Sequence, residues 1–120
     1  MKANLTLYAL SNILESVEMR SGLASLDATE RAILRFVGSN SEAGLEVCVT
    51  DVTDGLAGKA SLVTVLKRIK GLCATGWLTQ GSSEAHHRRI TLRLSEKASR
   101  EMTCASQAID DALTQLIKPT

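Results

Sequence analysis

Proline and aromatic residues are almost absent from this chain of 120 residues, which has one proline and three aromatic residues, Tyr8, Phe36 and Trp77. The hydrophobic core must therefore be built of Leu, Ile, Val, Ala and Met, a composition that favours a mostly helical protein. A hydrophobic fraction of 44% and a charged fraction of 22% are typical of a folded globular chain and exclude a disordered one. The length predicts a single domain over residues 1–120.

Paired cysteines and long apolar runs are also missing. Cys48, Cys73 and Cys104 are odd in number and far apart, and neither a Cys-x-x-Cys motif nor a histidine at zinc-ligand spacing accompanies them. The sequence thus predicts buried thiols that act as small hydrophobic residues, with no metal site and no other cofactor. No apolar run approaches 18 residues and the N-terminus lacks the features of a signal peptide, so we expect a cytoplasmic protein.

Arrangements typical of catalysis are absent as well. The sequence shows no set of nucleophile, base and orienting residue, no glycine-rich phosphate loop and no pair of carboxylates at a meaningful spacing. An enzyme is therefore not expected, and no residue is predicted to be catalytic.

Basic residues are concentrated in one part of the chain. Residues 59–100 contain nine basic and two acidic residues, a net formal charge of +7, whereas residues 1–58 carry −4 and residues 101–120 carry −2. A near-neutral whole-chain pI of 7.7 conceals this asymmetry. Because a polyanion responds to the local field of a basic patch, the segment predicts a nucleic-acid-binding surface.

The first half of the chain predicts three helices. Apolar residues between Asn4 and Val17 are too many for one narrow stripe, which indicates a helix covered on two sides. Asp27 and Glu30 have the spacing of a capping box for a second helix ending near Gly38, followed by a loop over residues 39–44 and a short extended segment over residues 45–49. A short third helix, capped by Thr50 and Asp51, must end within residues 55–58.

The second half predicts a helix, a hairpin and a long final helix. Ser61 is suited to cap a helix whose apolar stripe comprises Leu62, Val65, Leu66, Ile69, Leu72 and Cys73. After a helix stop at Gly76, residues 77–79 and 89–94 form two strands, and in the second strand Ile90, Leu92 and Leu94 would face inward while Arg89, Thr91 and Arg93 face outward. Ser95 can cap a final helix with a heptad-like, alanine-rich seam, which favours pairing with a second protomer over packing within the chain alone.

The order of these elements resembles the MarR-type winged-helix transcription regulators. The resemblance covers about seventy residues, from Leu26-Asp27-Ala28-Thr29-Glu30 through Val49-Thr50-Asp51-Val52, Ser61-Leu62-Val63-Thr64-Val65, Ile69-Lys70-Gly71-Leu72 and Gly76-Trp77-Leu78 to Arg88 and Leu94-Ser95-Glu96-Lys97-Ala98. At the tip of the hairpin, or wing, His86 stands where the family usually has an aspartate paired with the arginine at Arg88. The scarcity of aromatic residues also gives no basis for inferring the aromatic effector that many family members bind.

The resemblance implies a mainly helical winged helix-turn-helix fold that binds double-stranded DNA as a homodimeric regulator, with a repressor expected. The recognition helix would be residues 61–74 and the wing residues 77–94. The expected DNA contacts are Lys59, Ser61, Thr64, Lys67, Arg68, Lys70, His86, His87, Arg88, Arg89 and Arg93. The terminal helices, residues 3–20 and 96–117, would form the dimer interface with Leu10, Ile13, Val17, Met102, Ala105, Ile109, Leu113 and Leu116.

Two alternatives share this fold. One is a DNA-binding protein of plasmid or phage partition, of replication control or of DNA architecture. The other is a winged-helix module whose basic hairpin binds an acidic protein.

Overall fold

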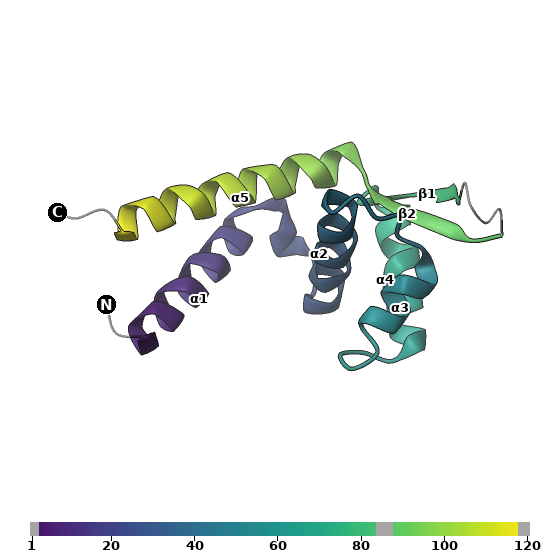
Figure 1. Cartoon of the computed structure of the whole chain (residues 1–120), viewed down its shortest axis with the longest axis horizontal. Coiled ribbons are helices and arrows are strands. Elements are labelled where there is room, and N and C mark those ends of the chain that lie inside the picture. Colours follow the sequence, from purple (N-terminus) through teal and green to yellow (C-terminus); the bar gives the residue numbers. More distant parts are fainter. Residues whose placement is uncertain (1–2, 84–87, 118–120) are drawn as a thin grey trace. The chain divides into compact units, whose positions relative to one another are not determined.

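The described part of the chain is mostly helical and ends in a long helix that follows a small hairpin. The computed structural model describes residues 3–83 and 88–117, and the side chains of residues 6–83 and 88–115. In order, the elements are α1 (Ala3–Arg20), the 3-10 helix η1 (Gly22–Ser25), α2 (Ala28–Glu42), α3 (Val49–Gly55), α4 (Leu62–Ala74), β1 (Leu78–Ser82), β2 (Ile90–Leu94) and α5 (Glu96–Ile117) (Figure 1). The predicted class, helical with a small hairpin, is confirmed.

The chain divides into two compact bodies. The winged body consists of residues 27–99, and the helical body consists of the residues up to 26 and from 100 onward. Within the described residues, no helix is both long enough and apolar enough to cross a bilayer.

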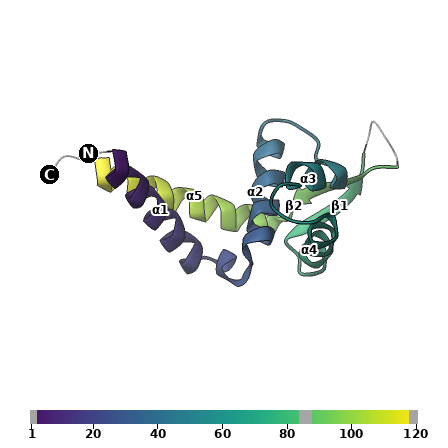
Figure 2. The same cartoon turned by 90° about the horizontal axis from the view of Figure 1, so that it is seen from below.

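In the winged body, α2, α3 and α4 pack against one another, and the hairpin lies against α2 and α4 (Figure 2). Each helix contributes an apolar stripe and the hairpin contributes an apolar face, and these surfaces meet in a single core. The largest fully buried apolar side chains of this core are Ile33, Leu34, Val37, Val52, Val65, Leu72 and Leu92. Trp77, which opens the hairpin, is also buried, and the Lys97 ammonium lies 4.4 Å from the centroid of its ring.

Helix α2 is longer than its sequence suggests. The capping box is present, with Glu30 N donating to Asp27 Oδ1 at 2.7 Å and Asp27 N donating to Glu30 Oε1 at 2.9 Å. The predicted end near Gly38 and the loop over residues 39–44 are wrong, because the helix continues to Glu42. Within the last turns, the side chains of Ser39 and Asn40 donate to carbonyl oxygens one turn earlier, and the chain turns only at Gly44, whose φ is +82°.

Helix α3 begins one residue before its expected caps. Its N-cap is Cys48, whose N–H donates to Asp51 Oδ2 at 2.8 Å, so Asp51 stabilises the helix start from inside the first turn. At the other end of α3, Gly55 lies directly against the ring of Phe36 on α2, and a Cβ at this position would overlap the ring. Glycine therefore sets how closely α3 approaches α2.

The hairpin pairs Leu78 with Leu94 and Ser82 with Ile90 in an antiparallel register. Its first strand extends to Ser82, three residues past the predicted end, and Gly76, with φ +83°, confirms the predicted helix stop. The predicted extended segment over residues 45–49 supplies a short third partner, since Leu92 N donates to Val47 O at 2.8 Å and Cys48 forms an isolated bridge with Thr91.

The predicted alternation in β2 is only partly correct. Leu92 is buried as expected, whereas Ile90 is 49% exposed and Thr91 is buried. Thr91 is covered because the Val47–Cys48 segment lies along that edge of β2. Position 90 lies near the hairpin tip, at the far end of the paired strands.

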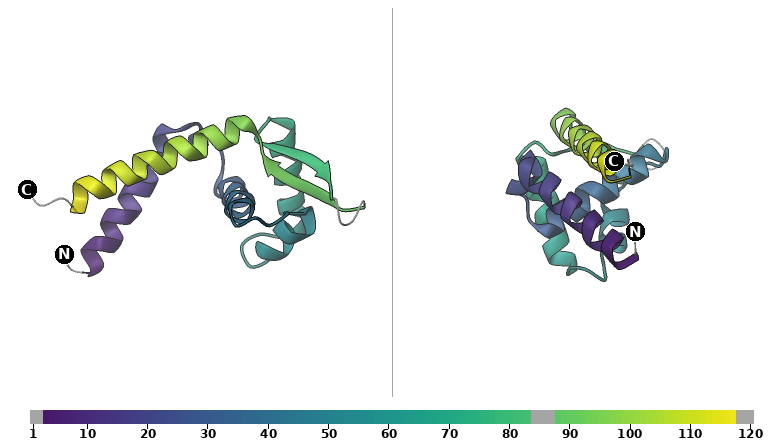
Figure 3. Two further views of the ribbon diagram at one scale, coloured as in Figure 1. Left: turned by 45° about the horizontal axis from the view of Figure 1, so that its top comes forward. Right: turned by 90° about the vertical axis from the view of Figure 1, so that its left-hand side faces the viewer.

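The helical body contains α1, η1 and most of α5 (Figure 3). Ser21 caps η1 by accepting a hydrogen bond from Leu23 N at 3.1 Å. Glu101 of α5 accepts a hydrogen bond from Gly22 N at 3.1 Å, which joins η1 to α5. The Glu101 carboxylate thus lies at the N-terminus of η1, where the partial positive charge of a helix start favours an anion.

Candidate nucleic-acid interface

A helix-turn-helix is formed by α3 and α4. After α3 ends, Leu56 O accepts hydrogen bonds from Lys59 N at 2.9 Å and Ala60 N at 3.1 Å, which closes a tight turn. Ser61 then caps α4 as predicted, since Thr64 N donates to Ser61 Oγ at 3.2 Å. Lys59 is exposed in the turn immediately before the helix.

One side of α4 is buried and the other is free. Val65, Ile69 and Leu72 are buried against the winged body as predicted. Leu62 and Leu66, which the sequence also places on the buried stripe, are instead 61% and 41% exposed. The stripe is narrower than the apolar pattern because α2, α3 and β1 cover only one sector of the helix.

The outward face of α4 combines basic and apolar side chains. Lys67 and Lys70 are exposed, and Val63 lies one turn before Lys67 with 62% of its surface accessible. Thr64 is half-buried and is partnered by Ser61, whose hydroxyl donates to Thr64 Oγ1 at 2.9 Å. These two hydroxyls are therefore held together at the start of the helix.

Arg68 lies on the flank of α4 and has a protein partner. Its Nε donates to Asp27 Oδ2 at 2.7 Å, and the two side chains are 42% and 43% exposed. Asp27 therefore contacts α4 through one carboxylate oxygen and caps α2 with the other. A contact through Nε leaves the terminal nitrogens of the guanidinium able to donate elsewhere.

The hairpin carries the remaining basic residues of the predicted surface. Arg88, Arg89 and Arg93 are exposed, and Arg93 stands opposite Thr79 in the strand register. At the base of the tip, Ser83 is buried, donates its hydroxyl to Glu46 and donates its N–H to Arg89 O at 3.1 Å. His86 and His87 lie outside the described residues.

The structure thus brings three segments of the predicted surface into one body: the turn with Lys59, the outward side of α4 and the arginines of the hairpin. The charged positions of these segments are exposed or half-buried, and their role in binding a nucleic acid stays a prediction. Sequence reasoning missed the exposed apolar side chains of α4 and the partner of Arg68, which is 41 positions away along the chain.

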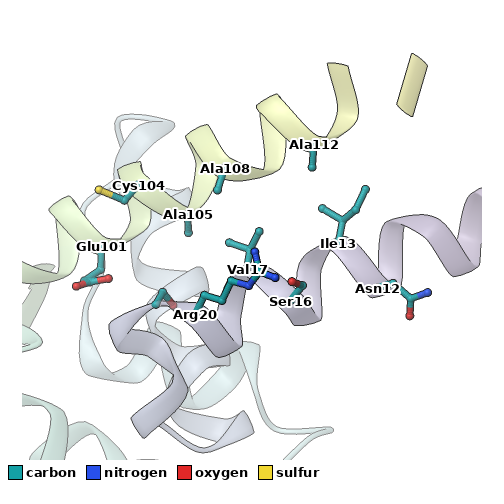
Figure 4. Close-up of a pocket in the computed structure, with 11 residues that line it drawn as sticks. Asn12, Ile13, Ser16, Val17, Arg20, Glu101, Cys104, Ala105, Ala108 and Ala112 are labelled. Atoms are coloured by element: carbon teal, nitrogen blue, oxygen red, sulfur yellow. The ribbon is translucent and has the colours of Figure 1, made fainter. Parts of the chain in front are cut away.

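A groove in the helical body lies between α1 and α5 and has a volume of about 500 Å³ (Figure 4). Ile13 and Val17 line it from α1, while small side chains line it from α5, namely Cys104, Ala105, Ala108 and Ala112. The thiols are less buried than expected: Cys48 is buried, Cys73 is half-buried and Cys104 is exposed. Among the described residues, no cluster of three or more His, Cys, Asp or Glu side chains is arranged to hold a metal ion.

No protein-family model matches the sequence, and no curated protein matches it. Solved structures do match the fold. MepR of S. aureus bound to ethidium bromide superimposes with a TM-score of 0.73 at 10% identity, covering 98% of this chain and 81% of the MepR chain. A MepR variant bound to an oligodeoxyribonucleotide superimposes with a TM-score of 0.71 at 12% identity, covering 98% of this chain and 83% of the MepR chain.

The transcriptional regulator Tm0710 of Thermotoga maritima gives a TM-score of 0.71 at 14% identity, covering 94% of this chain and 73% of that chain. The resemblance to MarR-type regulators that the sequence predicts is confirmed at the level of the fold. The chain therefore has the winged helix-turn-helix fold of these transcriptional regulators.

Proposed function

We propose that this chain binds double-stranded DNA sequence-specifically as a homodimer and represses transcription. The observation that carries the proposal is the capped α4 with its outward Lys67 and Lys70, in the same body as a hairpin that exposes Arg88, Arg89 and Arg93. A helix of this kind fits the major groove, and a basic hairpin fits the phosphate backbone or the minor groove.

The proposed contacts divide by chemistry. Lys59, Lys67 and Lys70 would neutralise phosphates or donate to base edges from the helix-turn-helix. The arginines of the hairpin would contact the backbone or a narrow minor groove, and His86 and His87 would join them. Ser61, Thr64 and Arg68 would contribute with the donors that their internal partners leave available.

The comparisons support DNA as the partner. One of the similar structures is a MepR variant with a bound oligodeoxyribonucleotide. Identity is only 12%, so the support comes from the shared fold together with the basic residues that this chain places on it.

A second copy of the chain accounts for the apolar surface of the helical body. Leu7, Tyr8, Leu10, Leu14 and Met19 of α1 are all more than 40% exposed. The alanine-lined groove beside α1 leaves room for side chains of another helix. We propose an interface formed by α1 and α5 with the following side chains: Leu10, Ile13, Val17, Met102, Ala105, Ile109, Leu113 and Leu116, the last of which lies outside the described side chains.

A dimer of this kind implies a two-fold site. Two recognition helices would enter successive major grooves about 34 Å apart, which corresponds to a pseudo-palindromic operator. One isolated palindrome near a promoter is expected for a repressor, whereas an array of repeats would indicate a role in partition or DNA architecture.

Binding of random and selected duplexes at increasing salt tests the proposal. A dimer that neutralises about eight phosphates should lose affinity with a log–log slope near −7. Lys67→Gln should reduce the magnitude of the slope by about 2 per dimer, while the control Lys97→Gln, at a lysine stacked on Trp77, should leave it unchanged. A salt-independent affinity, or selection from a random pool that yields no common sequence, would refute the proposal.

A further inference from the structure

The N-terminal half of α4 exposes large apolar side chains. Leu62, Val63 and Leu66 are 61%, 62% and 41% exposed, and all three lie within the first two turns of the helix. Single exposed apolar residues are ordinary on a protein surface, but three within five positions form a contiguous patch. Their place on the helix matters because the first turns of a recognition helix are the part that meets base edges.

The polar side chains around this patch each have one partner within the chain. Ser61 and Thr64 are hydrogen-bonded to each other at 2.9 Å, and Arg68 Nε is 2.7 Å from Asp27 Oδ2. The first two turns of α4 therefore present an apolar patch, with Lys67 beside it and with polar side chains that are partly engaged within the chain.

The charge around the patch favours a duplex as its partner. Lys67 follows Val63 by four positions and Lys70 follows Leu66 by four positions, so each lysine lies next to an apolar side chain on the helix surface. Lys59 adds a third exposed ammonium group in the preceding turn. A cationic rim around an apolar patch complements the DNA major groove, where phosphates flank the base edges.

The only apolar group on the major-groove edge of a base pair is the 5-methyl group of thymine. We propose that Leu62, Val63 and Leu66 recognise thymine methyl groups, so that the chain selects sites with thymines at fixed positions in each half-site. The inference rests on the proposed function and specifies which chemical feature of the duplex α4 recognises.

Replacing thymine by deoxyuridine tests the proposal, because it removes the methyl group and leaves the hydrogen-bonding edge intact. The probe is the tightest-binding duplex selected from a random pool, synthesised with single dT to dU changes at every thymine. We expect at least one position in each half-site at which the change weakens binding about fourfold, the value of one buried methyl group.

Two variants connect that dependence to the patch. Val63→Ser removes both methyl groups of the side chain, and Leu66→Ala shortens an exposed side chain. Each should bring the dT to dU affinity ratio at one position close to 1. The matched control is Leu45→Ala, since Leu45 is 58% exposed and lies outside α4, and it should leave every ratio unchanged.

The outcomes separate this inference from the proposed function. Sequence-selective binding with no loss at any dT to dU position would overturn the thymine inference and leave the DNA-binding proposal intact. Ratios that both α4 variants leave unchanged would also overturn it, because the methyl groups would then be recognised elsewhere. Failure to bind any duplex selectively would overturn the proposed function itself.

Discussion

Asp27 provides a sharp test of how the winged body is held together, because its two carboxylate oxygens have separate partners. Oδ1 accepts the N–H of Glu30 at 2.7 Å and caps α2, while Oδ2 accepts Arg68 Nε at 2.7 Å and joins α2 to α4. Asp27→Ala removes both interactions. Asp27→Asn keeps a carbonyl oxygen for the cap and removes the charge.

The magnitudes of the two contributions differ. Loss of an N-cap costs about 1 kcal/mol, with a range of roughly 0.5–2 kcal/mol. The ion pair must be discounted for solvent screening because its side chains are 42% and 43% exposed, which leaves about 0.2–1 kcal/mol. We therefore expect Asp27→Ala to lower the free energy of unfolding by about 1–2 kcal/mol. Asp27→Asn should lower it by less than about 1 kcal/mol, since only the charge is lost.

Urea unfolding followed by circular dichroism measures both values. All variants must be compared at one protomer concentration, because dimer formation would add a concentration-dependent term. Arg68→Gln should reduce stability in the wild-type background and have no effect in the Asp27→Asn background. Equal losses for Asp27→Ala and Asp27→Asn, or equal effects of Arg68→Gln in both backgrounds, would show that the two oxygens do not act separately.

Three further predictions concern glycines and the proposed dimer. Gly55→Ala should destabilise the protein by about 1–3 kcal/mol through overlap with Phe36. Gly71→Ala, in an open part of α4, should instead stabilise it by about 0.5–1 kcal/mol. Thermal unfolding that shifts in the same direction for both variants would contradict the packing argument. Gly76→Ala should cost about 1–2 kcal/mol because φ is +83°, and an unchanged urea midpoint would disprove the need for glycine there. Ile109→Asp should give monomers in sedimentation velocity, while the control Thr103→Asp, at an exposed site on α5 away from the proposed interface, remains dimeric. A dimer that survives Ile109→Asp would place the interface elsewhere.

The local features of the fold could be predicted from sequence because each depends on residues a few positions apart. The Asp27–Glu30 capping box, the Ser61 cap and the glycine stop at position 76 all lie where the pattern placed them. The end of α2 could not be predicted in this way. Serine and asparagine are common in loops, but Ser39 and Asn40 lie within α2, where their side chains donate to carbonyl oxygens one turn earlier.

Features that depend on distant segments were missed for a different reason. Periodicity identified Leu62 and Leu66 as apolar residues on a helix, but how much of that helix is covered depends on the other elements of the winged body. Thr91 is buried because Val47 and Cys48 lie beside β2, and nothing near position 91 in the sequence indicates this. The Asp27 partner of Arg68 belongs to the same category.

The short segment formed by Val47 and Cys48 also affects how the hairpin can associate with other chains. Exposed strand edges attract further strands, which is a common route to aggregation. Since Val47 O already accepts the N–H of Leu92, another polypeptide could add a strand at that position only by displacing this segment. Around Thr91 and Leu92, one border of the hairpin is thus already closed to self-association.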